Sequence, residues 1–84
     1  MKIKIKAKIK EKEHRRVKID TPFIKLDSLL KMCDAVQTGG HAKIVITNGE
    51  VKVNGEVCLQ RGKKLRENDT AEFNGVIYEV TDTL

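Results

Sequence analysis

The chain of 84 residues is long enough for one small domain, with 39% hydrophobic and 35% charged residues, an ordinary composition for a soluble globular domain. No apolar run approaches the roughly 18 residues that a membrane-spanning helix needs, and the basic start of the chain lacks the apolar core of a secretory signal. The two cysteines are too few for a disulfide scaffold. We therefore expect a single-domain, cytoplasmic protein that does not contact a membrane.

Charge is distributed unevenly along the chain. With 17 basic and 12 acidic residues, the net charge is +5. Residues 1–18 hold nine basic and two acidic side chains, giving +7, whereas residues 67–84 hold no basic and five acidic ones, giving −5. Uneven positive charge on a small domain favours a polyanion, usually nucleic acid, as the partner. The alternative is a lysine-rich surface that serves solubility alone.

The first ten residues alternate with a period of two, with Lys at every even position and Ile or Ala at positions 3, 5, 7 and 9. This pattern predicts a half-buried strand over residues 1–10. Its row of lysines has two interpretations, contact with phosphates or protection of an exposed sheet edge. Residues 11–16 are all charged or His, which predicts a turn or a solvated linker. We therefore expect an N-terminal basic strand and linker over 1–16 and a domain over 17–84.

Two short helices are predicted after a short strand at residues 17–19 and a break at Pro22. Phe23 and Ile24 lead into the first helix. Its apolar stripe has the spacing i, i+3, i+4, i+7 and consists of Leu26, Leu29, Leu30 and Cys33. Cys33 is therefore interpreted as a small buried hydrophobe. Thr38 is a suitable N-cap for the second helix. This helix is predicted to end at residues 48–49, where Gly49 suits the C-cap region.

The rest of the chain predicts two hairpins. Residues 51–53 and 56–58 flank one Asn-Gly pair, and residues 70–73 and 76–80 flank another. Asn-Gly supplies the positive φ angles of a two-residue type I′ turn. A basic loop over residues 60–66 joins the hairpins. The order of elements predicts an α+β fold in which two short helices pack on a small, twisted, mostly antiparallel sheet with an extra N-terminal strand.

Residues 25–31, 38–43 and 48–55 together resemble the RNA-binding domain of ribosomal protein S-four, also called the alpha-L motif. The match to its "G-x-V-x-V-N-G" passage consists of Gly49, Val51, Val53, Asn54 and Gly55, and its basic loop and "G-D" turn are matched by Arg61-Gly62-Lys63-Lys64-Leu65 and Asp69. The Gly-Gly pair and the R-G-K-K-L run are most similar to the small stand-alone, YaaA/YbcJ-like members. The resemblance covers residues 17–80 and implies an RNA-binding domain of this fold.

Lys25 stands where many members have Arg, and Gly39-Gly40 replace a common Ser-Arg, which removes guanidinium donors. The start of the second helix still suits a phosphate, because its N–H groups are unpaired and glycines allow close approach. Alternatively, the glycines allow a tight helix crossing. Asn54 either contacts RNA or holds its own turn. The predicted RNA-binding residues are Lys25, Lys31, Thr38, Gly39, Gly40, Lys43, Lys52, Asn54, Arg61, Lys63 and Lys64.

The chain has three aromatic residues. Phe23 and Phe73 are interpreted as core, and Tyr78 as a half-buried strand residue, so a platform for stacking single-stranded bases is not expected. We expect shape and phosphate contacts with structured RNA, ribosomal or transfer, by an accessory factor that is not an enzyme.

No nucleophile–base pair or zinc spacing is evident, so we expect no catalytic residues, no metal and no cofactor. The alternative function is a protein–protein interaction module that uses the N-terminal strand for sheet augmentation or dimerisation. Otherwise we expect a monomer that binds RNA, with the ribosome as the larger partner. DNA binding is a third option.

Overall fold

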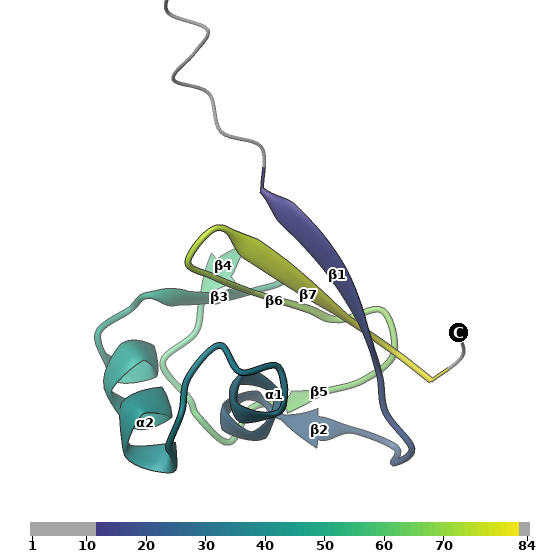
Figure 1. The fold of residues 1–84 in the computed structure, drawn as a ribbon, viewed down its shortest axis with the longest axis horizontal. Coiled ribbons are helices and arrows are strands. Elements are labelled where there is room, and N and C mark those ends of the chain that lie inside the picture. The colour runs from purple at the N-terminus through teal and green to yellow at the C-terminus, as the bar shows by residue number, and fades with distance from the viewer. Residues whose placement is uncertain (1–11, 83–84) are drawn as a thin grey trace, which may run out of the picture.

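Two helices cover one face of a twisted sheet in the computed structural model, which describes residues 12–82 (Figure 1). In chain order the elements are β1 (Glu13–Lys18), β2 (Ile24–Lys25), α1 (Leu26–Met32), α2 (Gly39–Thr47), β3 (Val51–Val53), β4 (Glu56–Val57), β5 (Lys64–Leu65), β6 (Thr70–Phe73) and β7 (Val76–Thr81). The main sheet has the order β1-β7-β6-β3-β4, and β2 and β5 form a separate antiparallel pair. The predicted α+β class, with two helices on a mostly antiparallel sheet, is confirmed.

The edge strand β1 differs from the prediction. It runs parallel to β7, from the pair Glu13↔Val76 to the pair Lys18↔Thr81. The expected turn or linker over residues 11–16 is therefore wrong for residues 13–16, and the expected boundary after residue 16 falls inside β1. The strand predicted over residues 17–19 overlaps the last two residues of β1. Local pattern could not indicate residues 13–16, because their pairing partners lie more than 60 residues away and an exposed edge strand needs no apolar alternation. The strand predicted over residues 1–10 lies outside the described residues.

α1 begins directly after β2, and its apolar stripe is fully buried at Leu26, Leu29 and Leu30. Cys33 is not inside the helix as expected but is its C-cap residue, half-buried against the core. Burial raises the pKa of the Cys33 thiol, which keeps it protonated at neutral pH. The residue therefore serves packing, as the helical spacing indicated.

The predicted cap of α2 is confirmed. The Thr38 hydroxyl oxygen accepts a hydrogen bond from the His41 N–H at 3.0 Å, which satisfies one of the donors that a helix start leaves unpaired. Ala42, Val45 and Ile46 face the core. The chain leaves the helix through Gly49 at φ 79°, a left-handed conformation that suits glycine.

Both predicted Asn-Gly hairpins are present. Asn54 and Gly55 have φ angles of 51° and 88°, and Asn74 and Gly75 have 54° and 82°, as a type I′ turn requires. The basic segment over residues 60–66 is not entirely a loop, because it contains β5, which pairs with β2.

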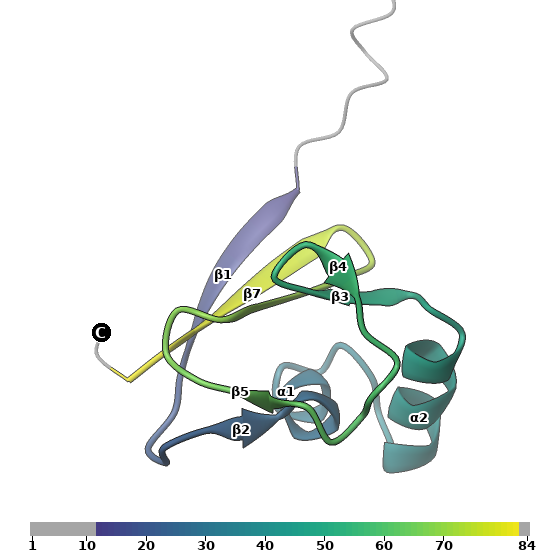
Figure 2. The same cartoon turned by 180° about the vertical axis from the view of Figure 1, so that it is seen from behind.

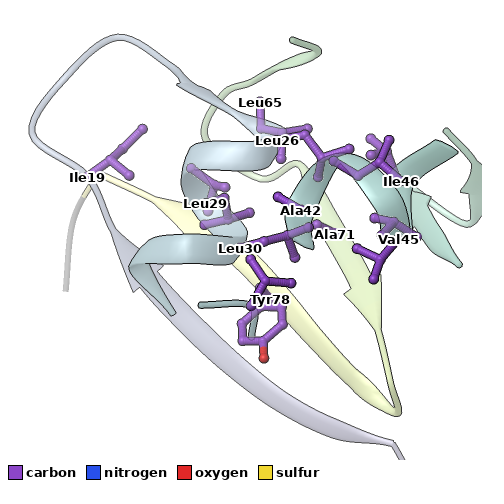
Figure 3. Close-up of a cluster of buried hydrophobic side chains, with 14 residues drawn as sticks. Ile19, Leu26, Leu29, Leu30, Ala42, Val45, Ile46, Leu65, Ala71 and Tyr78 are labelled. Carbon is purple, nitrogen blue, oxygen red and sulfur yellow. The ribbon is translucent and has the colours of Figure 1, made fainter. Parts of the chain in front are cut away.

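The core lies between the helices and the inner face of the main sheet (Figure 3). Figure 3 shows Leu30 and Ala42 from the helices near Ala71 and Tyr78 from β6 and β7. Tyr78, expected to be half-buried, is 4% exposed, and its burial raises the pKa of the phenol. Neither helix in the described part of the chain is long and apolar enough to cross a membrane.

Candidate nucleic-acid interface

The basic loop is fastened to the start of α1. The Leu26 N–H donates to the Lys63 carbonyl oxygen at 2.9 Å, and the Asp27 N–H donates to the Arg61 carbonyl oxygen at 3.1 Å. The first N–H groups of a helix have no partner within it, so these bonds satisfy the helix start and fix the loop at the same time. The side chains of Arg61 and Lys63 are exposed.

Pairing between β2 and β5 brings Lys25 opposite Lys64. Together with Arg61 and Lys63, these residues place four predicted contacts around one end of α1. We call Lys25, Arg61, Lys63 and Lys64 the loop cations.

Phe23 lies beneath two basic side chains. The Lys64 ammonium nitrogen is 4.8 Å from the centroid of the Phe23 ring, and the central guanidinium carbon of Arg66 is 5.5 Å from it. Both distances suit a cation–π contact, which extends to about 6 Å. The expectation that Phe23 belongs to the core is wrong, because it is half-buried outside the buried cluster. No local pattern indicates this contact, since Phe23 is about 40 residues from the cations that it contacts.

None of the loop cations forms an ion pair with another residue between 12 and 82. The three ion pairs in that range join Lys12 to Glu72, Arg15 to Glu13 and Lys18 to Asp20. Basic side chains held close together and not neutralised by ion pairs create a positive potential that attracts a polyanion. The loop cations therefore form the strongest candidate site for a phosphate backbone among the described residues.

The start of α2 is open. A Cβ atom built on Gly39 would meet no atom within 4 Å, and one on Gly40 would meet only the Thr38 hydroxyl oxygen at 3.9 Å. The glycines therefore do not serve a tight helix crossing, and that alternative is wrong. Thr38 and both glycines are exposed, and Lys43 lies exposed one turn further along. Figures 1 and 2 show the start of α2 and the β2–β5 pair at the same end of the molecule.

Two predicted contacts lie apart from the loop cations. Lys31 is in the last turn of α1, about 9 Å along the helix axis from Lys25. Lys52 is exposed on β3 between the buried Val51 and Val53. Because successive strand residues face opposite sides of a sheet, Lys52 lies on the face away from the helices, and we call this the outer face of the sheet.

Asn54 is engaged within the fold. Its side-chain nitrogen donates to an Asp69 carboxylate oxygen at 3.1 Å, and its side-chain oxygen accepts from the Thr70 N–H at 3.0 Å. The other Asp69 oxygen accepts from the Arg66 N–H at 2.8 Å. Asn54 thus ties the hairpin to the turn that follows the basic loop. Its turn role has geometric support, and its RNA contact stays a prediction.

The outer face of the sheet pairs its charges. The Lys12 ammonium lies 2.7 Å from a Glu72 carboxylate oxygen, and Lys52 stands opposite Glu72 in the β3–β6 register. The hydrogen bond from Lys12 lowers the pKa of the Glu72 carboxyl against the opposing effect of burial, and the charges of Lys12 and Lys52 lower it further. Over residues 12–82, no group of His, Cys, Asp and Glu is arranged to hold a metal ion.

Comparison with known proteins identifies similarity to one family. The model of the S4 domain matches residues 17–81. The protein named "Probable ribosome maturation protein RlbA" from Bacillus subtilis (strain 168) is 42% identical over 59 residues, which cover 70% of this chain and 83% of that protein. "Putative RNA-binding protein YbcJ" from Escherichia coli (strain K12) is 36% identical over 59 residues, which cover 70% of this chain and 84% of that protein.

Proposed function

Because the chain belongs to the S4-domain family, we propose that it binds structured RNA through shape and phosphate contacts and catalyses no reaction. The observation that carries this proposal is the group of loop cations, which are exposed and have no carboxylate partner among residues 12–82. Contacts of this kind position a phosphate backbone and carry little sequence information.

The RNA proposed as the target is folded ribosomal RNA. One relative is named for RNA binding and another for ribosome maturation, so ribosomal RNA or its precursor is favoured over transfer RNA. Double-stranded RNA is recognised mainly through its phosphates and 2′-hydroxyls rather than its bases. The protein would then act in the cytoplasm as an accessory factor, with a ribosomal particle as the larger partner.

The proposal is tested by removing two loop cations. We expect Lys63→Ala with Lys64→Ala to weaken binding to an A-form RNA hairpin by about tenfold at fixed salt, since two phosphate contacts are lost. The slope of log affinity against log salt should become shallower by about two. Fluorescence anisotropy with a labelled hairpin measures both quantities, and a DNA duplex of equal length tests whether RNA is preferred.

The matched control removes two lysines from residues 12–18, a second basic region of the chain, with Lys12→Ala and Lys18→Ala. This variant loses the same formal charge, but both lysines already have carboxylate partners. We expect less than a twofold change in RNA affinity, close to the small effect of an exposed ion pair. Equal weakening by the two double variants would show that net charge, rather than the loop, determines binding.

A further inference from the structure

Beside the basic loop, the surface holds a hollow of about 580 Å³. It lies between the β3–β4 hairpin and the segment that leads from β4 to the basic loop, and that segment lines one side. The volume falls within the range of about 300–1,000 Å³ that is typical of small-ligand sites. RNA-binding residues predicted from the sequence touch it at Asn54 and Lys63.

The walls of the hollow are partly apolar. Val57 and Leu59 line it and are 54% and 59% exposed. Single exposed aliphatic residues are common on protein surfaces, but here two of them face one hollow next to an array of cations. A flat, partly apolar group that entered the hollow would cover both side chains and gain from their burial.

Lys63 joins the hollow to the loop cations. Lys63 lines the hollow, while its carbonyl oxygen accepts from the Leu26 N–H and its own N–H donates to the Gln60 carbonyl oxygen at 3.2 Å. The rim is therefore held by α1 on one side and by its own turn on the other. A nucleotide whose phosphate contacts Lys63 would have its base within reach of the hollow.

The charge of Glu56 favours a base over a phosphate in the hollow. Glu56 lines the hollow, is exposed and forms no ion pair within residues 12–82. A carboxylate repels phosphate, but it accepts hydrogen bonds from the amino groups of bases. The lining of the hollow thus includes both a cation for phosphate, Lys63, and an acceptor for a base amino group, Glu56.

We propose that this hollow receives one unstacked nucleobase that carries an amino group, from the same RNA whose phosphates lie on the loop cations. This inference rests on the proposed function and adds a specific subsite to it. Bulges and loops in folded RNA present such bases. Guanine, adenine and cytosine are accepted, whereas uracil, which has no amino group, is disfavoured.

Methyl and amide NMR test this directly with three RNA hairpins, one with a bulged guanosine, one with a bulged uridine and one without a bulge. The guanosine hairpin should move the methyl signals of Val57 and Leu59 upfield, because the base ring would lie against them. The hairpin without a bulge should leave these methyl signals in place. All three hairpins should shift the amide signals of Lys63 and Lys64.

Substitutions give a second readout. We expect Leu59→Ser to weaken binding of the guanosine-bulged hairpin about fivefold, equivalent to about 1 kcal/mol. The affinity for the hairpin without a bulge should not change. The matched control is Ile44→Ser on α2, which removes an aliphatic side chain of similar exposure, 57%, outside the hollow. It should not change the ratio of the two affinities. Glu56→Gln should reduce the preference for guanosine over uridine.

The outcomes separate the two proposals. Amide shifts at the loop without methyl shifts in the hollow would overturn the base subsite and leave the proposed function standing. Absence of shifts at both places would overturn both. Methyl shifts that depend on protein concentration without RNA would assign the hollow to a second copy of the chain and overturn the base subsite. Equal effects of Leu59→Ser and Ile44→Ser would also overturn it.

Discussion

Residues 12–18 and residues 61–66 are both strongly basic, with four Lys or Arg residues each, yet they differ in how those charges are paired. In the first region, Lys12, Arg15 and Lys18 each have a carboxylate partner. In the second region, no cation forms an ion pair with a described residue. Acidic partners, both local and across the sheet, rather than the number of cations, therefore decide which basic segment can attract a polyanion.

The sheet register explains one of these pairs, Lys12 with Glu72, whereas Arg15–Glu13 and Lys18–Asp20 join residues two positions apart in sequence. β1 lies beside β7, and β7 lies beside β6, so a basic strand adjoins the acidic end of the chain. Arg16 stands opposite Glu79 in the register, and Glu72 on β6 accepts from Lys12. For the described residues, the opposite charges of the two ends of the sequence therefore meet in space. The basic loop instead adjoins β2 and α1, and its cations form no ion pair with a carboxylate of residues 12–82.

Reversing the charge of two loop cations should have the largest effect on RNA binding. We expect Arg61→Glu with Lys63→Glu to reduce RNA hairpin affinity about a hundredfold, because each change removes an attraction to phosphate and adds a repulsion. Thermal unfolding should change little, since both side chains are exposed and their backbone bonds to α1 remain. Fluorescence anisotropy and circular dichroism check the two expectations. Retained binding with an intact fold would refute the assignment of the loop.

The side-chain hydrogen bonds of Asn54 should contribute to the free energy of unfolding. We expect Asn54→Ala to lower the free energy of unfolding by about 2–3 kcal/mol, because two side-chain hydrogen bonds and a favourable residue at positive φ are lost. Asn74→Ala is the matched control, since Asn74 has nearly the same φ but no side-chain hydrogen bond to another described residue. It should cost about 1 kcal/mol. Urea unfolding distinguishes the two, and equal losses would contradict the anchoring role of Asn54.

The cation–π contacts should have a smaller effect. We expect Phe23→Leu to weaken hairpin binding about threefold, because Lys64 and Arg66 lose the ring that orders them. Phe23→Trp should restore the affinity, since indole also binds cations, while the salt slope stays the same in all three proteins. Unchanged affinity in Phe23→Leu, or failure of Trp to restore it, would contradict a positioning role for the ring.

The smallest effect concerns pH and the outer face of the sheet. The pKa of Glu72 is lowered from its ordinary value of 4.5, so its ionised form stabilises the fold. That contribution is present above the unfolded-state pKa and disappears as the pH falls through the lowered folded-state pKa. We expect Lys12→Ala to cost a few tenths of a kcal/mol at neutral pH. The cost should vanish in acid, as thermal unfolding across pH will show. A cost that stayed constant with pH would exclude the ion pair as its source.

Local signals predicted most of the fold. The apolar stripe of α1, the cap at Thr38 and the two Asn-Gly turns each depend on residues close together in sequence, and each is confirmed. Residues 13–16 of β1 escaped prediction because their strand character comes from pairing with β7 at the other end of the chain. The same limit hid the contact between Phe23 and the loop cations.

The candidate site was predictable as a set of residue types but not as an arrangement. The sequence indicated a basic loop, and the hydrogen bonds from Leu26 and Asp27 place that loop at the start of α1. It could not separate Lys52 from the loop cations, because the face of a strand residue matters only after the sheet has formed. The hollow beside Lys63 likewise arises from two segments that meet in space.

Lysine acylation footprinting with and without an RNA hairpin shows which of the two basic regions binds RNA, because it compares both regions in one sample. We predict that RNA protects Lys25, Lys63 and Lys64, while Lys12 and Lys18 react equally in both states. If RNA instead protected Lys12 and Lys18 and left the loop lysines reactive, the loop cations would not be the RNA-binding site.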